Sequence, residues 1–397
     1  MPISVLYIHH YGAFGGASRS LLEMVRAFPS NSVIVYLITQ RGPVAEIFKK
    51  QGVSVIETFG ISQFNNMQIG YYRKLRWLIL LRELCYIFPT LFAIIRARLK
   101  WRNIDIVHIN GVTMPLPVVF SSLIFRKPVV VHCRGLQRKK KNLRYRLIKF
   151  ILNHFSDITI AIDLNVKDTL SNDLNVKVIH NGFWPEYSPK EWNFDFSKRS
   201  LNVGIVGNLL PIKGIYEFVE AAKLCVEKGH DINFIIVGDN PFEKKGIKGL
   251  LLSKLGFRFD VRTDIKNFIQ QYGLKDYIHL LGFELNLKKV YKNIDVLCFP
   301  SHIAGAGRPV FEAAFFKVPS IVAVTDPKED TIIDKETGIC IPPKSSKALA
   351  DAIEYFYLNK HEIQRMGESA YRLAKSNFDI NKNAKLMLEI YKGLINL

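Results

Sequence analysis

Short runs of β-branched and apolar residues alternate with amphipathic segments along this chain, and they do so in two series. Continuous apolar strands separated by helical stretches are typical of parallel sheets that are covered on both faces. Two such series predict an α/β fold with two doubly wound, Rossmann-like domains. The first series of expected strands comprises Val5–Ile8, Val33–Leu37, Val53–Ile56, Ile106–Ile109, Val129–Val131, Ile158–Ile162 and Val176–Ile179. The second series comprises Val203–Val206, Phe234–Val237, Ile278–Leu280, Val296–Phe299, Ser320–Ala323 and Ile339–Ile341.

The stretch between the two series shows neither the alternation of apolar residues typical of a strand nor the spacing typical of a helix. It begins near Phe183 and contains Pro185 and Pro189 among aromatic and acidic residues, which favours a linker. We therefore expect an N-terminal domain over residues 1–185, a linker over 186–200 and a second domain over 201–375. Apolar residues then return at helical spacing and predict a terminal helix over 376–397.

The composition of the 397 residues, of which 48% are hydrophobic, suits two buried cores and excludes a disordered protein. The five cysteines show no C-x-x-C spacing, so reduced thiols in a cytoplasm are favoured over a disulfide framework or a zinc site. The N-terminus lacks the basic start and the apolar core of a secretory signal. We expect a cytoplasmic protein.

The net charge of +20 is concentrated in one part of the chain. From Arg96 to Lys149 there are fourteen Lys or Arg residues and a single acid, Asp105. Such an excess indicates an anionic partner: a membrane surface, an acidic acceptor or nucleic acid. Nucleic acid is disfavoured because no recognition helix, RNP sequence or zinc signature is present.

Residues 71–100 are rich in Leu, Ile, Trp, Tyr and Arg, and two interpretations remain open. They form either an interfacial helix pair on anionic lipid or helices that pack on the first sheet and expose a basic back. The longest apolar run, Leu84–Ile95, is interrupted by Pro89 and is shorter than the roughly 20 residues that a bilayer requires.

Glycine-containing loops follow several expected strands, and the most informative one follows Val296–Phe299. Gly305 and Gly307 lead there into a helix expected to begin near Pro309, a combination suited to phosphate. Arg308 adds a fixed positive charge, and Glu312, about one turn into the helix, can reach a ribose hydroxyl pair.

Another loop follows Val203–Val206. It contains Gly207 and then Lys213-Gly214 at a helix start, where an ammonium group can reach a diphosphate. The Walker spacing is absent, which excludes a P-loop ATPase. Gly238 and Gly282 follow two further strands of this series.

Three features of the first domain are candidate ligand contacts, and each also has a simpler structural explanation. Gly15 and Gly16 let a backbone approach a ligand closely, or they merely form a tight strand-to-helix turn. His132 lies at a strand end, where ligands of such folds bind, although a lone histidine is often only packed. Asn181-Gly182 is by itself a strong turn signal.

Taken in order, these segments resemble the retaining glycosyltransferases of family 4, which have the GT-B fold. The matching segments are Gly15-Gly16-Ala17, His132, Val178-Ile-His-Asn-Gly182, Val206-Gly-Asn-Leu-Leu-Pro-Ile-Lys-Gly214, Ile236-Val-Gly-Asp239, His279-Leu-Leu-Gly-Phe283 and Pro300-Ser301 through Glu312-Ala313. The resemblance covers nearly the whole chain. It implies two domains facing a central cleft, with the terminal helix returning to the N-terminal domain.

The resemblance also implies roles for single residues. Glu312 would hold the ribose, Lys213 would neutralise the leaving diphosphate, Gly15 and Gly16 would donate backbone N–H groups to it, and His132 would contact the donor sugar. Lys213, Arg308, Glu312 and His132 are thus the expected catalytic residues. The expected substrate-binding residues are Gly15, Gly16, Asn181, Gly207, Asn208, Gly238, Gly282, Phe283, Gly305, Ala306, Gly307, Pro309 and Val310.

Two positions depart from the family pattern. Ala304 stands where the family usually has a glutamate, eight positions before Glu312, and Asn208 stands where it usually has an arginine. Arg308 can supply the charge that Asn208 lacks. The alternative that these departures suggest is a non-catalytic nucleotide-sugar-binding or scaffold protein.

The expected reaction transfers a sugar from a UDP- or GDP-sugar to a lipid-linked or surface-glycan acceptor, as in polysaccharide, lipopolysaccharide or capsule biosynthesis. No D-x-D sequence is present to hold a divalent ion, so we expect metal-independent transfer without a further cofactor. The basic N-terminal domain suggests peripheral contact with an anionic membrane on the inner face of the plasma membrane.

Overall fold

The computed structural model describes residues 1–68, 77–138, 143–184, 199–240, 260–284, 286–303 and 305–396. The chain divides into two compact units. Unit 1 comprises Met1–Trp184 and Asp379–Leu397, and unit 2 comprises Pro185–Phe378. The expected linker lies largely outside the described residues, as do Ala304 and residues 139–141 of the basic run.

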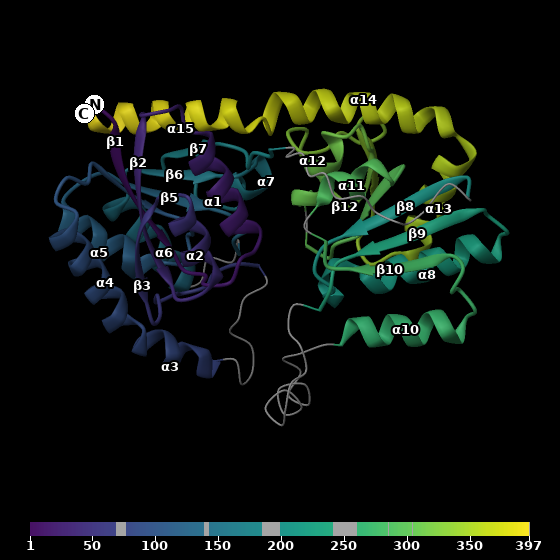
Figure 1. Ribbon diagram of the computed structural model, residues 1–397, viewed down its shortest axis with the longest axis horizontal. Helices are drawn as coiled ribbons and strands as arrows, with labels where there is room; N and C mark the ends of the chain where they lie inside the picture. Colours follow the sequence, from purple (N-terminus) through teal and green to yellow (C-terminus); the bar gives the residue numbers. More distant parts are fainter. Residues whose placement is uncertain are drawn as a thin grey trace. The chain divides into compact units, whose positions relative to one another are not determined.

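Unit 1 is built on a parallel seven-stranded sheet in the order β3-β2-β1-β4-β5-β6-β7 (Figure 1). Its strands are β1 (Ile3–His9), β2 (Val33–Gln40), β3 (Ser54–Thr58), β4 (Ile106–Ile109), β5 (Val129–Cys133), β6 (Ile158–Ala161) and β7 (Val176–Val178). Its helices are α1 (Gly16–Ala27), α2 (Pro43–Lys50), α3 (Leu78–Cys85), α4 (Ile87–Lys100), α5 (Pro115–Phe125), α6 (Leu143–Phe155), α7 (Leu164–Lys167) and α15 (Ile380–Ile395).

The C-terminal helix α15 belongs to unit 1 although it follows unit 2 in the sequence. Its apolar face joins α1, α2 and the sheet in one core, to which it contributes Ala384 and Met387. The hydroxyl of Tyr391 is buried there, 2.6 Å from the hydroxyl of Tyr7 and 2.6 Å from Nδ1 of His108. Buried polar groups need such partners, so this cluster fixes how the helix sits on the sheet.

Gly182 of the Asn-Gly pair serves the packing of α15. A Cβ atom at Gly182 would lie 2.6 Å from Cα of Ile380, so only glycine allows this approach. Asn383 Nδ2 also donates to the carbonyl of His180 at 3.0 Å. The glycine is thus explained by the arrival of α15 and not by the turn alone.

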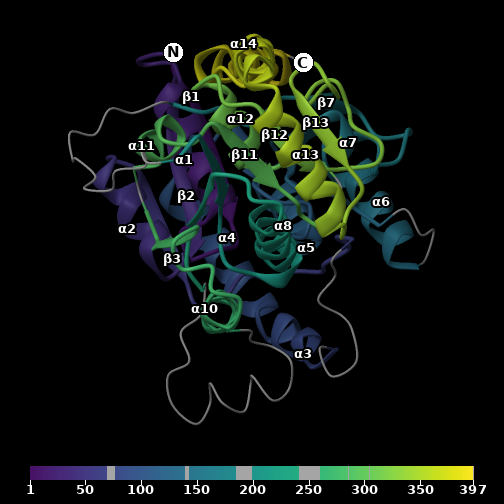
Figure 2. The ribbon, with the colours of Figure 1, turned by 90° about the vertical axis from the view of Figure 1, so that its right-hand side faces the viewer.

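Unit 2 contains a parallel six-stranded sheet in the order β10-β9-β8-β11-β12-β13. Figure 2 shows β11, β12 and β13 of this sheet, with α12 and α13 beside them. Its strands are β8 (Leu201–Val206), β9 (Ile232–Val237), β10 (Ile278–Gly282), β11 (Val296–Phe299), β12 (Ser320–Ala323) and β13 (Gly338–Ile341). Its helices are α8 (Ile215–Glu227), α10 (Val261–Gln271), α11 (Leu287–Lys292), α12 (Arg308–Ala314), α13 (Ser346–Leu358) and α14 (Lys360–Asn377), and a 3₁₀ turn covers Pro211–Lys213.

Two apolar clusters cover the two faces of this sheet. One joins the strands to α8, α10 and α13 through residues such as Phe218, Ile265 and Phe356. The other joins them to α11 and α12 through residues such as Tyr291 and Val310. All strands expected from the sequence are present, which confirms the prediction of two doubly wound α/β sheets.

Candidate active site

In both sheets the strand order reverses beside the first strand of the unit, between β1 and β4 and between β8 and β11. Loops that leave the carboxyl ends of two such strands diverge to opposite faces, which opens a crevice where ligands of doubly wound folds bind. Most of the residues selected from the sequence lie in loops at these edges.

Three glycine loops of unit 2 are joined by backbone hydrogen bonds. The N–H of Gly207 donates to the carbonyl of Val237 at 2.9 Å, and the N–H of Gly238 donates to the carbonyl of Gly282 at 2.8 Å. Gly207 and Gly238 have φ angles of 148° and 143°, which side chains disfavour. A Cβ atom at Gly238 would lie 1.8 Å from the carbonyl oxygen of Gly207, so the loops touch backbone to backbone.

Lys213 ends the 3₁₀ turn after β8 and is half-buried. Its Nζ lies 5.6 Å from the centroid of the Phe299 ring, a cation–π distance. Burial lowers the pKa of this ammonium group. Among the described residues no carboxylate pairs with it, so none of them neutralises this cation beside the crevice.

The loop after β11 is anchored to the Lys213 turn. A Cβ atom at Gly214 would lie 2.0 Å from the carbonyl oxygen of Pro300, and Gly214 has a φ of 75°. The N–H of His302 donates to the carbonyl of Ile212 at 2.9 Å, and His302 Nε2 lies 2.7 Å from Glu217 Oε1. The two loops at the reversal point therefore form one connected structure.

The rest of this loop leads into α12. Gly305 has a φ of 105°, and a Cβ atom at Gly307 would lie 2.4 Å from the ring of Phe299. The helix begins at Arg308, one residue before the expected Pro309. Val310 faces the core at 5% exposure, and Ala306 packs against the same cluster. Side-chain contact of Val310 with a substrate is therefore disfavoured, and only its backbone remains for that role.

Glu312 lies on α12 in a buried polar group with Arg308 and Tyr291. Its Oε1 accepts from Arg308 Nε at 2.6 Å, and its Oε2 accepts from the Tyr291 hydroxyl at 2.8 Å. Glu312 is 2% exposed. A carboxylate has about four acceptor positions, so these contacts are compatible with further donors. The role of Glu312 toward a ribose stays a prediction.

Two other selected side chains of unit 2 are exposed at the same edge. Asn208 follows Gly207 and is exposed, and the ring of Phe283, directly after β10, is 70% exposed. Exposed aromatic rings at the edge of a crevice are suited to stacking on a planar base.

In unit 1, Gly15 and Gly16 are exposed and have open space where a Cβ would stand. Gly15 has a φ of −144°, which any residue adopts. The close backbone approach in this loop is made instead by Gly12, where a Cβ would lie 2.3 Å from the carbonyl oxygen of Arg41. Packing within the protein therefore does not account for Gly15 and Gly16.

His132 lies inside β5 and is 3% exposed. It belongs to a group of buried histidines whose rings gather at the carboxyl edge of the first sheet: His9, His10, His108 and His132. Burial lowers the pKa of each of them, to about 3 for His10. The group is therefore neutral at physiological pH, and its rings act as hydrogen-bonding groups without charge.

Arg134 connects this group and was not selected from the sequence. Its Nε donates to Asn110 Oδ1 at 2.6 Å, its Nη1 donates to Asn181 Oδ1 at 2.7 Å, and its Nη2 lies 3.5 Å from His132 Nδ1. A charged residue directly after a buried strand is the signal that would have identified it. The structure thus brings His132 and Asn181 together through Arg134.

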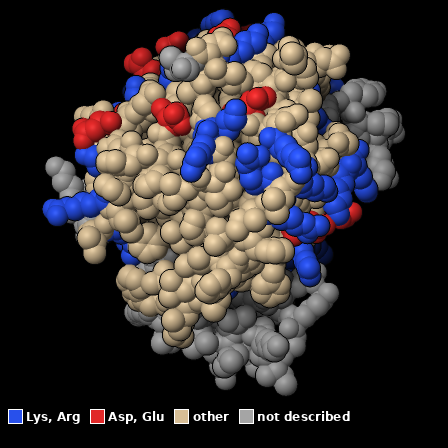
Figure 3. All heavy atoms as spheres, turned by 90° about the vertical axis from the view of Figure 1, so that its left-hand side faces the viewer, with Lys and Arg blue, Asp and Glu red and all other residues tan. Residues whose placement is uncertain are grey.

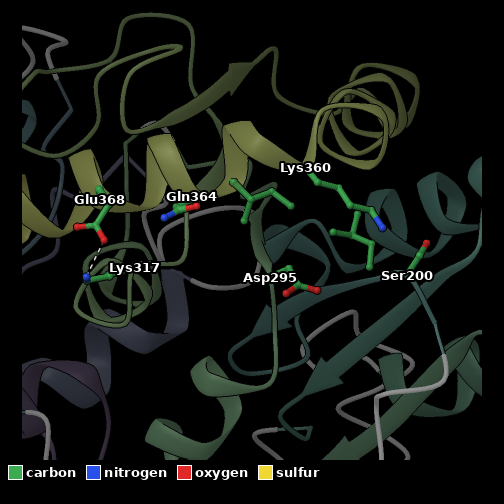
Figure 4. A pocket seen from close by; sticks show the side chains of 8 residues that line it. Ser200, Asp295, Lys317, Lys360, Gln364 and Glu368 are labelled. Atoms are coloured by element: carbon green, nitrogen blue, oxygen red, sulfur yellow. Dashed lines mark hydrogen bonds and ion pairs between the residues drawn. The ribbon is translucent and has the colours of Figure 1, made fainter.

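A pocket of about 310 Å³ lies at the other edge of the unit 2 sheet (Figure 4). Leu201 begins β8 and Asp295 precedes β11, so the pocket lies at the amino ends of these strands. Lys317 and Glu368 in its wall pair with each other at 2.6 Å. The glycine loops and Lys213 do not line it, so this pocket is separate from the candidate site.

Within the described ranges no group of three or more His, Cys, Asp or Glu residues is arranged to hold a metal ion. Lys213 and Arg308 contribute positive charges at the unit 2 edge.

Comparisons with known proteins agree with this geometry. Residues 14–187 match Glycosyltransferase Family 4, and residues 190–373 match Glycosyl transferases group 1. The structure of HepE from Anabaena in complex with UDP superposes with a TM-score of 0.76 at 19% identity and covers 99% of this chain and 100% of that one. Sucrose-phosphate synthase from Thermosynechococcus elongatus superposes with a TM-score of 0.71 at 17% identity, covering 99% of each chain. These likenesses show the GT-B fold.

Curated relatives are distant. A UDP-Gal:alpha-D-GlcNAc-diphosphoundecaprenol alpha-1,3-galactosyltransferase of Escherichia coli is 26% identical over 75% of this chain and 77% of its own length. Alpha-D-kanosaminyltransferase of Streptomyces kanamyceticus and the capsular polysaccharide biosynthesis glycosyltransferase CapM of Staphylococcus aureus are each 24% identical. The matches cover 48% and 44% of this chain but only 45% and 42% of those two proteins. On the family matches and the fold together, the chain belongs to the group 1, family 4 glycosyltransferases.

Proposed function

We propose that this protein is a retaining glycosyltransferase that transfers a hexose from a UDP-sugar to a lipid-linked acceptor during synthesis of a surface glycan. The proposal rests mainly on the environment of Lys213. This residue is a half-buried cation without a carboxylate partner among the described residues, at the strand reversal of a doubly wound sheet. A group of this kind is suited to a diphosphate, because the ligand supplies the missing negative charge.

The names of the relatives support the choice of donor and acceptor. The Escherichia coli relative is named for a UDP-galactose donor and a diphosphoundecaprenol-linked acceptor. HepE has been solved with UDP-glucose. Other relatives are named for capsular polysaccharide and for the lipopolysaccharide core. A nucleotide-sugar donor and reduced cysteines favour the cytoplasm as the place of reaction.

In the proposed reaction the bond between the anomeric carbon and the diphosphate oxygen breaks, and a bond from the acceptor hydroxyl oxygen to that carbon forms on the same face. The proton of the hydroxyl passes to the departing diphosphate, so no protein nucleophile is required. Lys213 stabilises the negative charge that grows on the leaving oxygen, which is where a fixed charge lowers the barrier most. Arg308 is held by Glu312 and contributes a second positive charge beside the same loop.

We assign the acceptor and the sugar hydroxyls to unit 1. The neutral histidines and Arg134 offer directional hydrogen bonds, and the exposed Gly15 and Gly16 offer backbone N–H groups. In this assignment His132 is a positioning residue, because its ring is buried and contacts Arg134.

The test compares Lys213→Ala with Lys266→Ala, a control that removes an exposed lysine of the same unit on α10. UDP is expected to raise the melting temperature of the wild type and of the control but not of Lys213→Ala. Transfer from UDP-hexoses to an undecaprenyl-diphosphate-linked sugar is expected to fall at least about 100-fold in Lys213→Ala, since one oxyanion donor contributes about 10²–10³ in rate.

Two results would count against the proposal in different ways. If UDP stabilises all three proteins equally, Lys213 does not meet the diphosphate. If UDP binding depends on Lys213 but no hexose is transferred from any UDP-sugar, the protein is a non-catalytic nucleotide-sugar-binding protein, which is the alternative that Asn208 and Ala304 suggest.

A further inference from the structure

Helices α3 and α4 of unit 1 carry a row of large apolar side chains that face solvent. Backbone hydrogen bonds continue across Tyr86, from its N–H to Arg82 and from the N–H of Thr90 to its carbonyl, so the two helices form one rod. At 100° per residue the exposed apolar positions fall within an arc of about 120°. They are Leu78, Leu81, Leu84, Phe88, Phe92, Ile95 and Leu99, exposed by between 41% and 77%. We call this row the outer apolar face.

The opposite side of the rod is fixed to unit 1. Ala93 and Ala97 are buried, and α4 packs against β2, β3 and α5. Thr90 Oγ1 accepts from the N–H of Ser62 at 2.8 Å, and the buried carboxylate of Glu83 accepts from the N–H of Gln63 at 2.9 Å. The rod is therefore bound on one face, so the exposure of the other face is a stable feature of the fold.

The stretch Leu78–Lys100 is long and apolar enough, by length and composition alone, to cross a membrane. It is longer than the run Leu84–Ile95 that the sequence indicated. A crossing orientation conflicts with its contacts, because it would break the hydrogen bonds of Glu83 and Thr90 and remove α4 from the sheet. Lying along an interface keeps all of these contacts.

Basic side chains flank the outer apolar face. Arg96 and Lys100 lie on one side of the arc at 100° per residue, and Arg98 lies on the other. Arg126 and Lys127 follow at the end of the adjacent helix α5, and all five are exposed. Over residues 77–138 the chain has nine Lys or Arg and only two acids, Glu83 and Asp105, of which Glu83 is buried.

The surface around this face is continuous over neighbouring helices. Helix α5 packs against both α4 and α6. Leu123 on α5 and Leu143, Leu147 and Phe150 on α6 are exposed as well. Seen from the side of α4 and α5, the molecule shows a broad area without charged side chains, with Lys and Arg gathered beside it (Figure 3).

We propose that unit 1 docks onto the surface of an anionic bilayer through the outer apolar face of α3 and α4, with the flanking arginines and lysines on the lipid headgroups. In this orientation the apolar side chains are buried at the boundary of the acyl chains, and the cations lie at the lipid phosphates. Both the outer apolar face and its basic flanks then contribute to binding. Docking of this kind does not require the proposed sugar transfer.

Charge favours lipid over a second copy of the chain as the occupant. A symmetric interface would bring the same basic flanks of two copies together, in a chain of net charge +20. Anionic headgroups neutralise these flanks instead, and the fluid acyl region accepts protruding side chains of unequal length without shape complementarity.

The experiment measures co-sedimentation of the full chain with vesicles of phosphatidylcholine alone and with vesicles that also contain roughly 30% of the anionic lipid phosphatidylglycerol, which gives the surface a negative potential. The test variant is Leu81→Ser/Phe88→Ser/Phe92→Ser/Leu99→Ser. The matched control is Leu358→Ser on α13 of unit 2, which is 68% exposed. Thermal unfolding reports whether each variant is folded.

The wild type and the control are expected to bind the anionic vesicles, and the four-serine variant is expected to bind at least about 100-fold more weakly. A second variant, Arg96→Gln/Lys127→Gln, is expected to lose about tenfold or more on anionic vesicles and to change little on neutral ones. Wild-type binding is expected to weaken with salt.

Three results would overturn the proposal. The first is equal vesicle binding by the wild type and a folded four-serine variant. The second is a dimer in sedimentation velocity that this variant abolishes, without vesicle binding by the wild type, which would identify the face as a contact between copies. The third is resistance to extraction from vesicles at high salt and alkaline pH, which would indicate a spanning helix.

Discussion

The buried ion pair between Arg308 and Glu312 leads to a prediction about stability that does not depend on any ligand. Replacing Arg308 by Met keeps most of the apolar stem but removes the guanidinium from a carboxylate that is 2% exposed. The hydroxyl of Tyr291 remains as a donor at 2.8 Å, yet it is uncharged. Glu312 then loses the charged partner that Arg308 provides, and breaking a buried pair in this way costs about 3–5 kcal/mol.

The size of the effect on melting follows from the size of the unit. One kcal/mol shifts the melting temperature of a 150–250-residue domain by about 2–4 °C, so Arg308→Met is expected to lower the transition of unit 2 by about 6–20 °C. Calorimetry is the suitable assay because two compact units can unfold in separate transitions.

A second substitution tests the cause. Arg308→Met/Glu312→Gln removes both charges, while the amide oxygen of Gln still accepts from Tyr291. This double variant is expected to be more stable than Arg308→Met alone, because a neutral amide then replaces the buried carboxylate that lost its arginine. Arg365→Met provides the matched control, since Arg365 pairs with Glu362 at 2.6 Å but its own side chain is 49% exposed, so its loss should affect melting much less.

One refuting result is that Arg308→Met melts like the wild type. The other is that the double variant melts below Arg308→Met by as much as Glu312→Gln alone melts below the wild type. In the first case the carboxylate is well solvated despite its burial. In the second case the two side chains contribute independently and are not coupled.

Three further predictions concern pH and packing. Burial lowers the pKa of Lys213, and only its charged form is expected to bind a diphosphate, so the affinity for UDP should fall as the pH rises toward 10.5. Binding should then be accompanied by proton uptake, which calorimetry in buffers of different ionisation enthalpy detects. Lys213→Ala should lose this pH dependence. The pKa of His10 is about 3 in the folded chain and 6.5 when unfolded, so the unfolded state takes up the proton first, and His10 alone should account for a loss of about 2 kcal/mol in the stability of unit 1 between pH 6.5 and 5, measured by urea unfolding. His9, His108 and His132 should add to this loss, because burial lowers their pKa values too. His10→Phe should therefore remove only the share of His10, and an unchanged slope would contradict the prediction. Gly238→Ala should destabilise unit 2 and abolish UDP binding, because the new Cβ atom would clash with the carbonyl of Gly207. Gly229→Ala is the control, since no atom lies within 4 Å of its Cβ position, and it should leave UDP binding intact.

Much of the fold follows from local pattern. The apolar runs that predicted strands correspond to β1–β13, because strands buried on both faces of a parallel sheet require such runs regardless of what surrounds them. The glycine loops were likewise visible, since the φ values of Gly207, Gly238 and Gly305 are local requirements that the sequence meets by itself.

The candidate site was predictable only in part. Lys213 and Glu312 could be selected because loop and helix positions after a strand are fixed by the chain itself. The burial of Glu312 against Tyr291 could not be predicted, since that partner comes from another helix and depends on how α11 and α12 pack on one face of the sheet. The contacts of Arg134 could not be predicted for the same reason, because its partners Asn110 and Asn181 are distant in sequence.

The strands, the glycine loops and the position of Lys213 follow from local sequence, because periodicity and backbone conformation are properties of neighbouring residues. Tertiary structure alone decided that Tyr391 shares a buried hydrogen-bond group with Tyr7, 384 positions away. It also decided which side of α3 and α4 faces outward. Both sides of that rod are apolar in sequence, and only packing against β2, β3 and α5 separates the buried alanines from the exposed leucines and phenylalanines.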